Sequence, residues 1–363
     1  MIYLDNAAAA LTDRETAGYF ARMLVECGAN QEAGHKEGRR LRQLISDAEL
    51  RLSRALMDSP YPGETGDFRV LWCGSGTEAL NIFSTCIDPG KAVTSQLEHP
   101  ALAAALKRTA RSLHMLGCDR KTGKLVPERG DWDIAAFHLI QSETGIVQDP
   151  EELFSATPGA VRFLDAVQAA GKMPLPRCAD ILAVSGNKFG APGCAALLVN
   201  PQWDGAEAFC ARAEKMRHEA YLAGRMLPAA ILACAAVAEK RRARMADCLR
   251  RTAELNGELR TGCLRLGLKP TIPAENASPF ILHLLAPGYQ GAVLVRMLSE
   301  EGVTIASGSA CASETKTPSP ALTALGYGRD EAFSGLRISF GFDSSGEDVK
   351  NLLSSLEKVL KKY

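Results

Sequence analysis

The stretch from residue 181 to residue 199 reads Ile-Leu-Ala-Val-Ser-Gly-Asn-Lys-Phe-Gly-Ala-Pro-Gly-Cys-Ala-Ala-Leu-Leu-Val. Its two apolar runs, Ile181–Val184 and Ala195–Val199, are typical of buried strands, and a glycine-rich loop that holds Ser185 and Lys188 joins them. A lysine that leaves a buried strand is costly unless it is paired or bonded. An apolar strand a little earlier in the chain ends in the same way, at Asp165. Charges at strand ends of an open α/β sheet generally serve a site, so we expect a functional site here.

The same alternation of apolar runs and helical stretches extends from about residue 69 to residue 200. Amphipathic segments such as Thr77–Cys86 and Pro100–Arg111 separate the runs. The pattern predicts seven strands: Arg69–Trp72, Lys91–Ser95, His114–Cys118, Asp133–Ile140, Val161–Leu164, Ile181–Val184 and Ala195–Val199. Strand–helix alternation of this kind predicts an α/β fold with a mostly parallel sheet that is covered on both faces.

The rest of the chain predicts a smaller α+β domain. Two long helical segments around Met226–Leu259 precede three candidate strands and a final amphipathic helix, Gly346–Lys362. The strands are Phe280–Leu284, Gly302–Ala306 and Gly335–Phe340. We place the large domain at residues 12–235 and the small domain at residues 1–11 and 236–363.

The amino-acid composition limits which kinds of molecule the protein is expected to bind. The 363 residues include 42 basic and 42 acidic side chains, so no net charge recruits nucleic acid or an anionic membrane, and a small molecule or a protein is the expected partner. The apolar run Met226–Ala238 is shorter than the roughly 20 residues that span a bilayer and predicts a buried helix. The 11 cysteines form no C-x-x-C pair and no metal-ligand pattern. We therefore expect a soluble cytoplasmic protein with neither disulfides nor a metal ion.

A phosphate site is predicted where Cys73-Gly-Ser-Gly-Thr-Glu-Ala79 joins a strand to a helix. Free backbone N–H groups and the positive helix end suit an anion there. The same residues match the G-x-G-x-x-A dinucleotide fingerprint, with Glu98 about twenty residues further on. However, a lysine that forms a Schiff base, an aspartate for a pyridinium nitrogen and a phosphate cradle are the parts of a pyridoxal-phosphate site. A nicotinamide enzyme would leave Lys188 unexplained, so pyridoxal phosphate is the favoured cofactor.

Motifs that match one family run almost from end to end, and the chain resembles the cysteine desulfurases, a group of class V aminotransferases with the fold type I architecture. The matching stretches are Tyr3-Leu-Asp-Asn-Ala-Ala, Gly76-Thr-Glu, Glu98-His99, Glu143-Thr-Gly-Ile-Val-Gln148-Asp, Asp165-Ala-Val-Gln168, Ser185-Gly-Asn-Lys188, Ser307-Gly-Ser-Ala-Cys311 and Leu336-Arg337-Ile-Ser-Phe-Gly. The resemblance implies a pyridoxal-phosphate transferase with a large, mostly parallel seven-stranded sheet and a smaller α+β domain.

The resemblance also implies roles for single residues. Lys188 would carry the cofactor as a Schiff base, and His99 would stack on its ring and exchange protons. The other cofactor-binding residues would be Asp165 at the ring nitrogen, Gln168 and Ser142 at the phenolic oxygen, and Gly76, Thr77, Ser185 and Asn187 at the phosphate. Arg337, assisted by Asn30, would clamp the substrate carboxylate, because a planar guanidinium fits a carboxylate through two bonds.

Cys311 is the expected sulfur acceptor. It lies in Ala306-Ser-Gly-Ser-Ala-Cys-Ala-Ser, whose small residues predict a mobile loop, and such loops commonly carry function. The family's reaction would convert L-cysteine to L-alanine and leave a persulfide on Cys311. The short motif resembles desulfurases that pass sulfur to scaffold or carrier proteins for iron–sulfur cluster assembly. A homodimer is expected, since family members borrow residues from a partner subunit.

The sequence departs from the family pattern at four places. Asn187 stands where the family has histidine, and Ser142 stands where it has asparagine. Arg225-Met226 replaces a turn whose threonine reaches the partner's phosphate, and Met216-Arg-His218 replaces a glycine-rich loop. Because the last two changes lie where the active site and the dimer interface meet, a β-eliminating cysteine or selenocysteine lyase remains the alternative function. The sequence names neither the sulfur acceptor nor the pathway.

Overall fold

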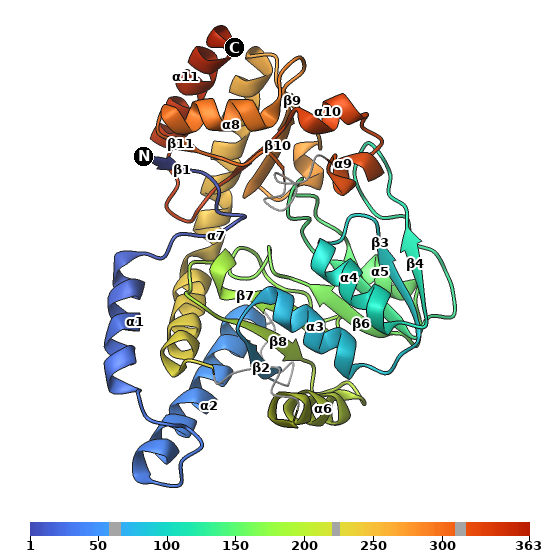
Figure 1. Cartoon of the computed structure of the whole chain (residues 1–363), viewed down its shortest axis with the longest axis vertical. Coiled ribbons are helices and arrows are strands. Elements are labelled where there is room, and N and C mark those ends of the chain that lie inside the picture. Colours follow the sequence, from blue (N-terminus) through green and yellow to red (C-terminus); the bar gives the residue numbers. More distant parts are fainter. Residues whose placement is uncertain (58–66, 220–225, 309–316) are drawn as a thin grey trace.

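The computed structural model describes residues 1–57, 67–219, 226–308 and 317–363. A seven-stranded sheet forms the centre of the larger part of the molecule (Figure 1). Its strands are β2 (Arg69–Cys73), β3 (Lys91–Ser95), β4 (Ser112–Leu116), β5 (Ile134–His138), β6 (Val161–Asp165), β7 (Ile181–Ser185) and β8 (Ala195–Val199). Their order across the sheet is β2-β8-β7-β6-β5-β3-β4.

Six of these strands point in the same direction, and β8 alone runs antiparallel to both of its neighbours, β7 and β2. The predicted seven-stranded, mostly parallel sheet is therefore confirmed. The predicted strand at residues 114–118 is β4 and begins two residues earlier, at Ser112, because pairing with Lys91 of β3 sets its register. Connections between parallel strands need crossovers, which the helices supply.

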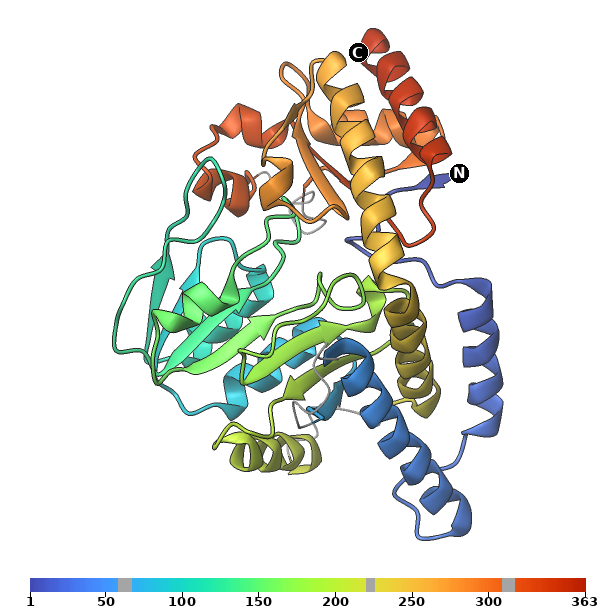
Figure 2. The same ribbon diagram turned by 180° about the vertical axis from the view of Figure 1, so that it is seen from behind.

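Helices cover both faces of the sheet, as the two opposite views show (Figures 1 and 2). Alternate residues of β7 point to opposite faces, with Ile181 in one apolar cluster and Leu182 in the other. Helices α3 (Gly76–Cys86), α4 (Pro100–Thr109) and α6 (Ala206–Glu219) lie on one side, and α2 (Lys36–Met57), α5 (Pro150–Ser155) and α7 (Pro228–Arg265) lie on the other. Helix α1 (Arg14–Glu26) packs against α7.

Helix α7 is one continuous element of 38 residues. The prediction of two separate helical segments in this region is therefore wrong. No glycine or proline interrupts the chain between Pro228 and Gly257, so nothing ends the helix there. The apparent division has another cause: the residues up to Ala238 are almost all buried, as predicted for this apolar run, and the later turns are buried on one side only.

The C-terminal part forms two small sheets. An antiparallel sheet contains β9 (Lys269–Pro270), β10 (Ile281–Leu285) and β12 (Gly335–Ser339), and a parallel pair joins β1 (Ile2–Tyr3) to β11 (Val303–Thr304). The helices around them are α8 (Gly291–Glu300), α9 (Pro320–Ala324), α10 (Arg329–Phe333) and α11 (Gly346–Lys362). The N-terminal strand thus lies beside the C-terminal elements (Figure 1). The boundary at residues 235 and 236 falls within α7 and stays a prediction.

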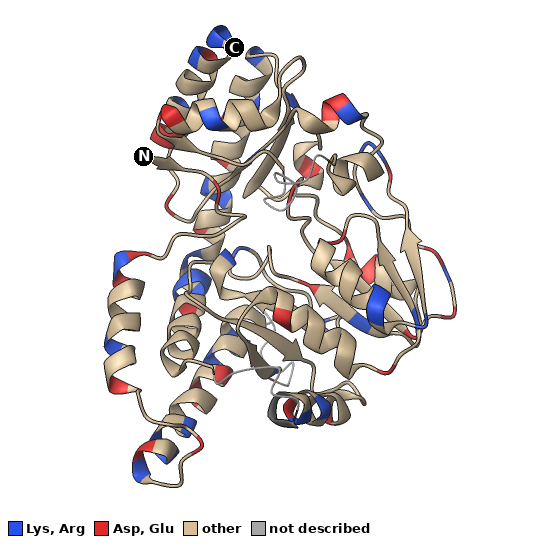
Figure 3. Cartoon of the chain, viewed as in Figure 1, with Lys and Arg blue, Asp and Glu red and all other residues tan. Residues whose placement is uncertain are grey.

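Charged side chains of both signs are intermixed along the outer helices such as α1, α2 and α11 (Figure 3). This distribution agrees with the balanced composition of the chain. None of the helices in the described ranges is long and apolar enough to cross a membrane.

Candidate active site

A cavity of about 320 Å³ lies at the carboxyl ends of β5, β6 and β7, where the large sheet meets the C-terminal elements. Its floor comes from the sheet and from the N-termini of α3 and α4. Ala7 and Ala8 from the N-terminal segment and Arg337 from β12 complete its wall. The cavity contains most of the predicted site residues: Gly76, Thr77, His99, Ser142, Asp165, Gln168, Ser185, Asn187, Lys188 and Arg337.

One end of the cavity offers donors for an anion. Gly76 and Thr77 are the first two residues of α3, so their N–H groups have no acceptor within the helix. A Cβ atom placed on Gly76 would lie 3.7 Å from the Cβ of Ser185, which brings the helix start next to the end of β7. Ser185 is buried, and its hydroxyl does not cap the short helix that follows. Three donors from two distant segments therefore converge at this end.

Asp165 lies buried at the end of β6. One of its oxygens accepts the N–H of Val167 at 3.0 Å. Burial is the main cause that raises the pKa of this carboxyl, while the Val167 bond and the nearby His99 act in the opposite direction. A cationic N–H donor beside Asp165 would offset the cost of holding its charge.

His99 is both the N-cap of α4 and a wall of the cavity. Its Nδ1 accepts the backbone N–H of Ala101 at 3.2 Å, so the proton of the neutral imidazole is on Nε2. The ring therefore has a fixed tautomer with a donor at Nε2. His99 thus starts a helix and also lines the cavity, and its role toward the cofactor stays a prediction.

Lys188 ends the short helix that follows β7, and its ammonium donates to the carbonyl of Ala8. The Asn187 side chain accepts the N–H of Gly193 at 3.2 Å through Oδ1, which leaves its amide nitrogen as a donor. Gln168 donates to the carbonyl of Ala7 at 2.9 Å. The N-terminal segment thus contacts two of the predicted cofactor residues.

Arg337 is almost fully buried on β12 and points toward the cavity. Its guanidinium pairs with Asp5 at 2.7 Å and donates to the backbone carbonyl of Ser142 at 3.1 Å. The internal partner that such an arginine needs is therefore Asp5, from the opposite end of the chain. A substrate carboxylate would have to share the guanidinium with Asp5.

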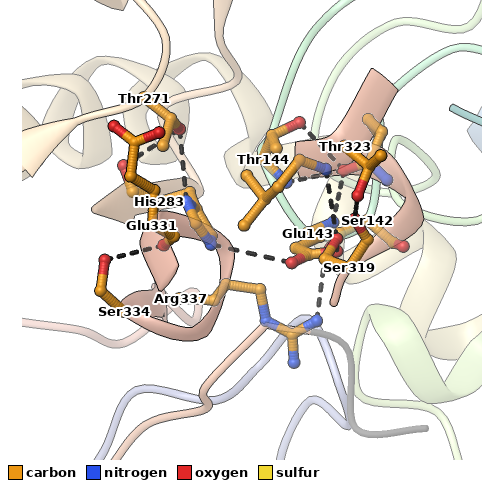
Figure 4. A network of polar contacts seen from close by, with 12 residues as sticks. Ser142, Glu143, Thr144, Thr271, His283, Ser319, Thr323, Glu331, Ser334 and Arg337 are labelled. Atoms are coloured by element: carbon orange, nitrogen blue, oxygen red, sulfur yellow. Dashed lines mark hydrogen bonds and ion pairs between the residues drawn. The ribbon is translucent and has the colours of Figure 1, made fainter. Parts of the chain in front are cut away.

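A buried polar network lies directly behind Arg337 (Figure 4). Glu143 accepts the hydroxyl of Ser319 at 2.7 Å, and its other oxygen is 3.8 Å from His283 Nε2. Burial is the main cause that raises the pKa of Glu143. Burial and the charge of Arg337 lower the pKa of His283 to about 3, so that imidazole is neutral at pH 7. The directions of both pKa shifts favour the uncharged forms of Glu143 and His283, and the positive charge beside them is that of Arg337.

Sequence reasoning missed several residues of this region. His138, at the end of β5, contacts Glu98 at 2.8 Å and lines the cavity. A histidine in the apolar run Ile-Ala-Ala-Phe-His was a usable signal, and so was the place of Asp5 in the stretch Tyr3-Leu-Asp-Asn-Ala-Ala, but His283 gave none. Lys172, which donates to Gln168, was also missed.

One predicted site residue is not in the cavity. Asn30 is exposed in the loop between α1 and α2, where its side chain accepts the N–H of Glu32 at 3.0 Å. Asn30 is therefore not among the residues that line the cavity within this one chain, and its assistance to Arg337 stays a prediction. Cys311 and Arg225 lie outside the described residues. No group of three possible metal ligands occurs in the described ranges.

The residues present fit pyridoxal phosphate. The donors at Gly76, Thr77 and Ser185 suit its phosphate, and the buried carboxyl of Asp165, which accepts the Val167 N–H, suits a pyridinium N–H as a further donor. Lys188 lies in the same cavity with a primary amine for the aldehyde. The fold and the site together define a pyridoxal-phosphate-dependent enzyme.

The sequence matches the model of the aminotransferase class-V family over residues 2–352. The chain belongs to this family. It is 27% identical to a cysteine desulfurase of Gluconacetobacter diazotrophicus, over 99% of this chain and 94% of that protein. It is also 27% identical to the putative cysteine desulfurase IscS 1 of Bacillus subtilis, over 99% of both chains.

Solved structures show the same fold. A NifS-like protein from Rickettsia africae superimposes with a TM-score of 0.84 at 19% identity, over 99% of both chains. The structure of SspA in complex with cysteine superimposes with a TM-score of 0.70 at 20% identity, over 94% of this chain and 99% of that one.

Proposed function

We propose that this chain is a cysteine desulfurase that converts L-cysteine to L-alanine and transfers the sulfur to Cys311. The observation that carries the proposal is the meeting of Lys188, Asp165 and Arg337 in one cavity, each from a different strand end or strand. Relatives called cysteine desulfurases, aligned over 99% of the chain, support the same reaction.

Arg337 binds and orients the substrate. Its guanidinium is held in place by Asp5 and by the carbonyl of Ser142, so little side-chain entropy remains to be lost when a carboxylate arrives. An amino acid bound in this way would place its α-carbon toward Lys188. Pyridoxal phosphate in this cavity supplies the electron sink that makes the bonds at the substrate α- and β-carbons labile.

Proton transfer falls to Lys188 and His99. The amine of Lys188 exchanges a proton at the substrate α-carbon, and the Nε2–H of His99 is the second donor in the cavity. The buried carboxylate of Asp165 would favour the protonated form of the ring nitrogen when the cofactor is bound.

Cys311 completes the group transfer. Its thiolate attacks the substrate sulfur, a sulfur–sulfur bond forms, the Cβ–sulfur bond breaks and the β-carbon takes up a proton. The products are alanine and a Cys311 persulfide, so no external oxidant is needed. Transfer of that sulfur to an acceptor protein for iron–sulfur cluster assembly, a homodimeric assembly and a cytoplasmic location are parts of the same proposal.

The test is an assay of purified protein with L-cysteine and a reductant in which alanine, sulfide and pyruvate are followed. Wild type should form alanine and sulfide, and Cys311→Ser should form neither. Cys178→Ser is the matched control, because Cys178 is a partly buried thiol outside the cavity whose pKa burial raises to about 11. Pyruvate that persists in Cys311→Ser would show a β-eliminating lyase and refute the proposal.

A further inference from the structure

Lys172 is a buried lysine close to the cavity that the proposed reaction does not use. Only 3% of its surface is exposed, and none of the ion pairs in the described ranges involves it. Burial lowers its pKa to about 7, and the positive charges of Lys188, Arg337 and Arg241 act in the same direction. Its ammonium lies 5.9 Å from the ring centre of Phe280. Such a lysine costs stability, so its presence calls for another explanation.

Lys172 donates a hydrogen bond to the side chain of Gln168. The ammonium donates to Gln168 Oε1 at 3.4 Å, and Gln168 Nε2 donates to the Ala7 carbonyl at 2.9 Å. These two bonds fix which side of the Gln168 amide holds the oxygen and which holds the nitrogen. Rotation of the amide by 180° would place its N–H donors against the Lys172 ammonium and its oxygen against the Ala7 carbonyl oxygen. A primary amide has two N–H bonds, and Ala7 uses one of them. The second N–H is what Gln168 can offer to the cavity that it lines.

We propose that Lys172 is a positioning residue, which fixes the Gln168 amide so that an N–H and not its carbonyl oxygen faces the ring oxygen of the bound cofactor. This inference rests on the proposed function, since it takes Gln168 to lie beside that oxygen. A reversed amide would bring two acceptors together there. The positive charge of Lys172 behind the amide would also strengthen the Gln168 N–H as a donor to an anionic oxygen.

The experiment compares two ligands on the apoprotein. Pyridoxal phosphate and its 3-deoxy analogue, which lacks the ring oxygen, are titrated by absorbance or fluorescence into wild type and Lys172→Met. Methionine keeps a similar volume but neither donates nor carries charge. We expect Lys172→Met to weaken pyridoxal phosphate by roughly 10- to 100-fold, the range of a hydrogen bond to a charged acceptor, and to leave the analogue within about twofold.

A thermal melt of the apoprotein separates positioning from a structural role. At pH 7 the melting temperature of Lys172→Met should equal or exceed that of wild type, because the variant removes a buried charge without a counter-ion. Gln168→Leu is the second variant: it should lose the same discrimination between the two ligands, and Lys172→Met should add nothing to it. A lower melting temperature with equal weakening of both ligands would overturn the inference, and so would unchanged binding of both.

The two proposals can fail separately. Wild type that binds pyridoxal phosphate but releases no alanine from cysteine would refute the desulfurase. The ratio of the two ligand affinities would still decide the role of Lys172.

Discussion

Acid should destabilise the protein through His283, a histidine that the fold keeps neutral. Its folded-state pKa is lowered from 6.5 to about 3 by burial and by the charge of Arg337. Between these values the unfolded chain binds a proton that the native state does not, so the free energy of unfolding falls as the pH falls from about 6.5 to about 3. The contribution of His283 to the free energy of unfolding is fully present above about pH 6.5 and is lost as the pH falls toward 3.

The size of the effect follows from the shift. At 1.36 kcal/mol per pKa unit, protonation of His283 in the unfolded chain should remove about 2 kcal/mol of stability between pH 7 and pH 5. Glu143, 3.8 Å away, has a raised pKa and therefore contributes with the opposite sign, stabilising the native state as the pH falls. Glu143 is present in both proteins to be compared, so the difference between them reports His283.

The assay is urea unfolding of the apoprotein, wild type and His283→Asn, at pH 7 and pH 5. Asparagine removes the titrating group and can keep a bond to Thr271, which contacts His283 Nδ1 at 3.3 Å. The variant starts from lower stability at pH 7, but its loss on going to pH 5 should be about 2 kcal/mol smaller than that of wild type. Equal losses in wild type and His283→Asn would refute the reasoning.

Two further predictions concern the substrate clamp and the packing of the C-terminal part. Arg337→Lys should raise KM for cysteine by roughly 10- to 100-fold with a smaller change in kcat, because an ammonium cannot bind a carboxylate through two parallel bonds. An unchanged KM in steady-state kinetics would contradict the binding of the substrate carboxylate by Arg337. Gly291→Ala should destabilise the protein by about 1–3 kcal/mol, since its Cβ would lie 2.2 Å from the Gly335 carbonyl oxygen. Gly257 lies on an exposed side of α7, where an added Cβ would meet nothing within 4 Å, so Gly257→Ala should stabilise the protein by about 0.5–1 kcal/mol. Urea unfolding midpoints that move in the same direction for both variants would count against this packing argument.

Much of the fold was readable from local pattern. Strands such as Ile181–Ser185 alternate between two apolar layers, and helices begin at recognisable caps such as Ser75, so both follow from neighbouring residues. The motif around Lys188 and the strand-end position of Asp165 both lead to residues that line one cavity, and their roles there stay predictions. The pattern failed where burial changed along a single element, as in α7, because a change from all-round to one-sided burial imitates a helix boundary.

Contacts between distant parts of the chain were decided only by the tertiary structure. Asp5 pairs with Arg337 across 332 positions, and nothing near either residue predicts the other. Glu143, His283 and Ser319 come from three separate segments, and burial shifts the pKa values of Glu143 and His283. Lys172 looks like a surface lysine in the sequence, and only its enclosure behind Gln168 gives it a role. The sequence by itself determined which elements form and which chemical groups stand at their ends, because those depend on local propensity and periodicity. The tertiary structure alone decided which groups are buried together, and burial is what determines their charge and their partners.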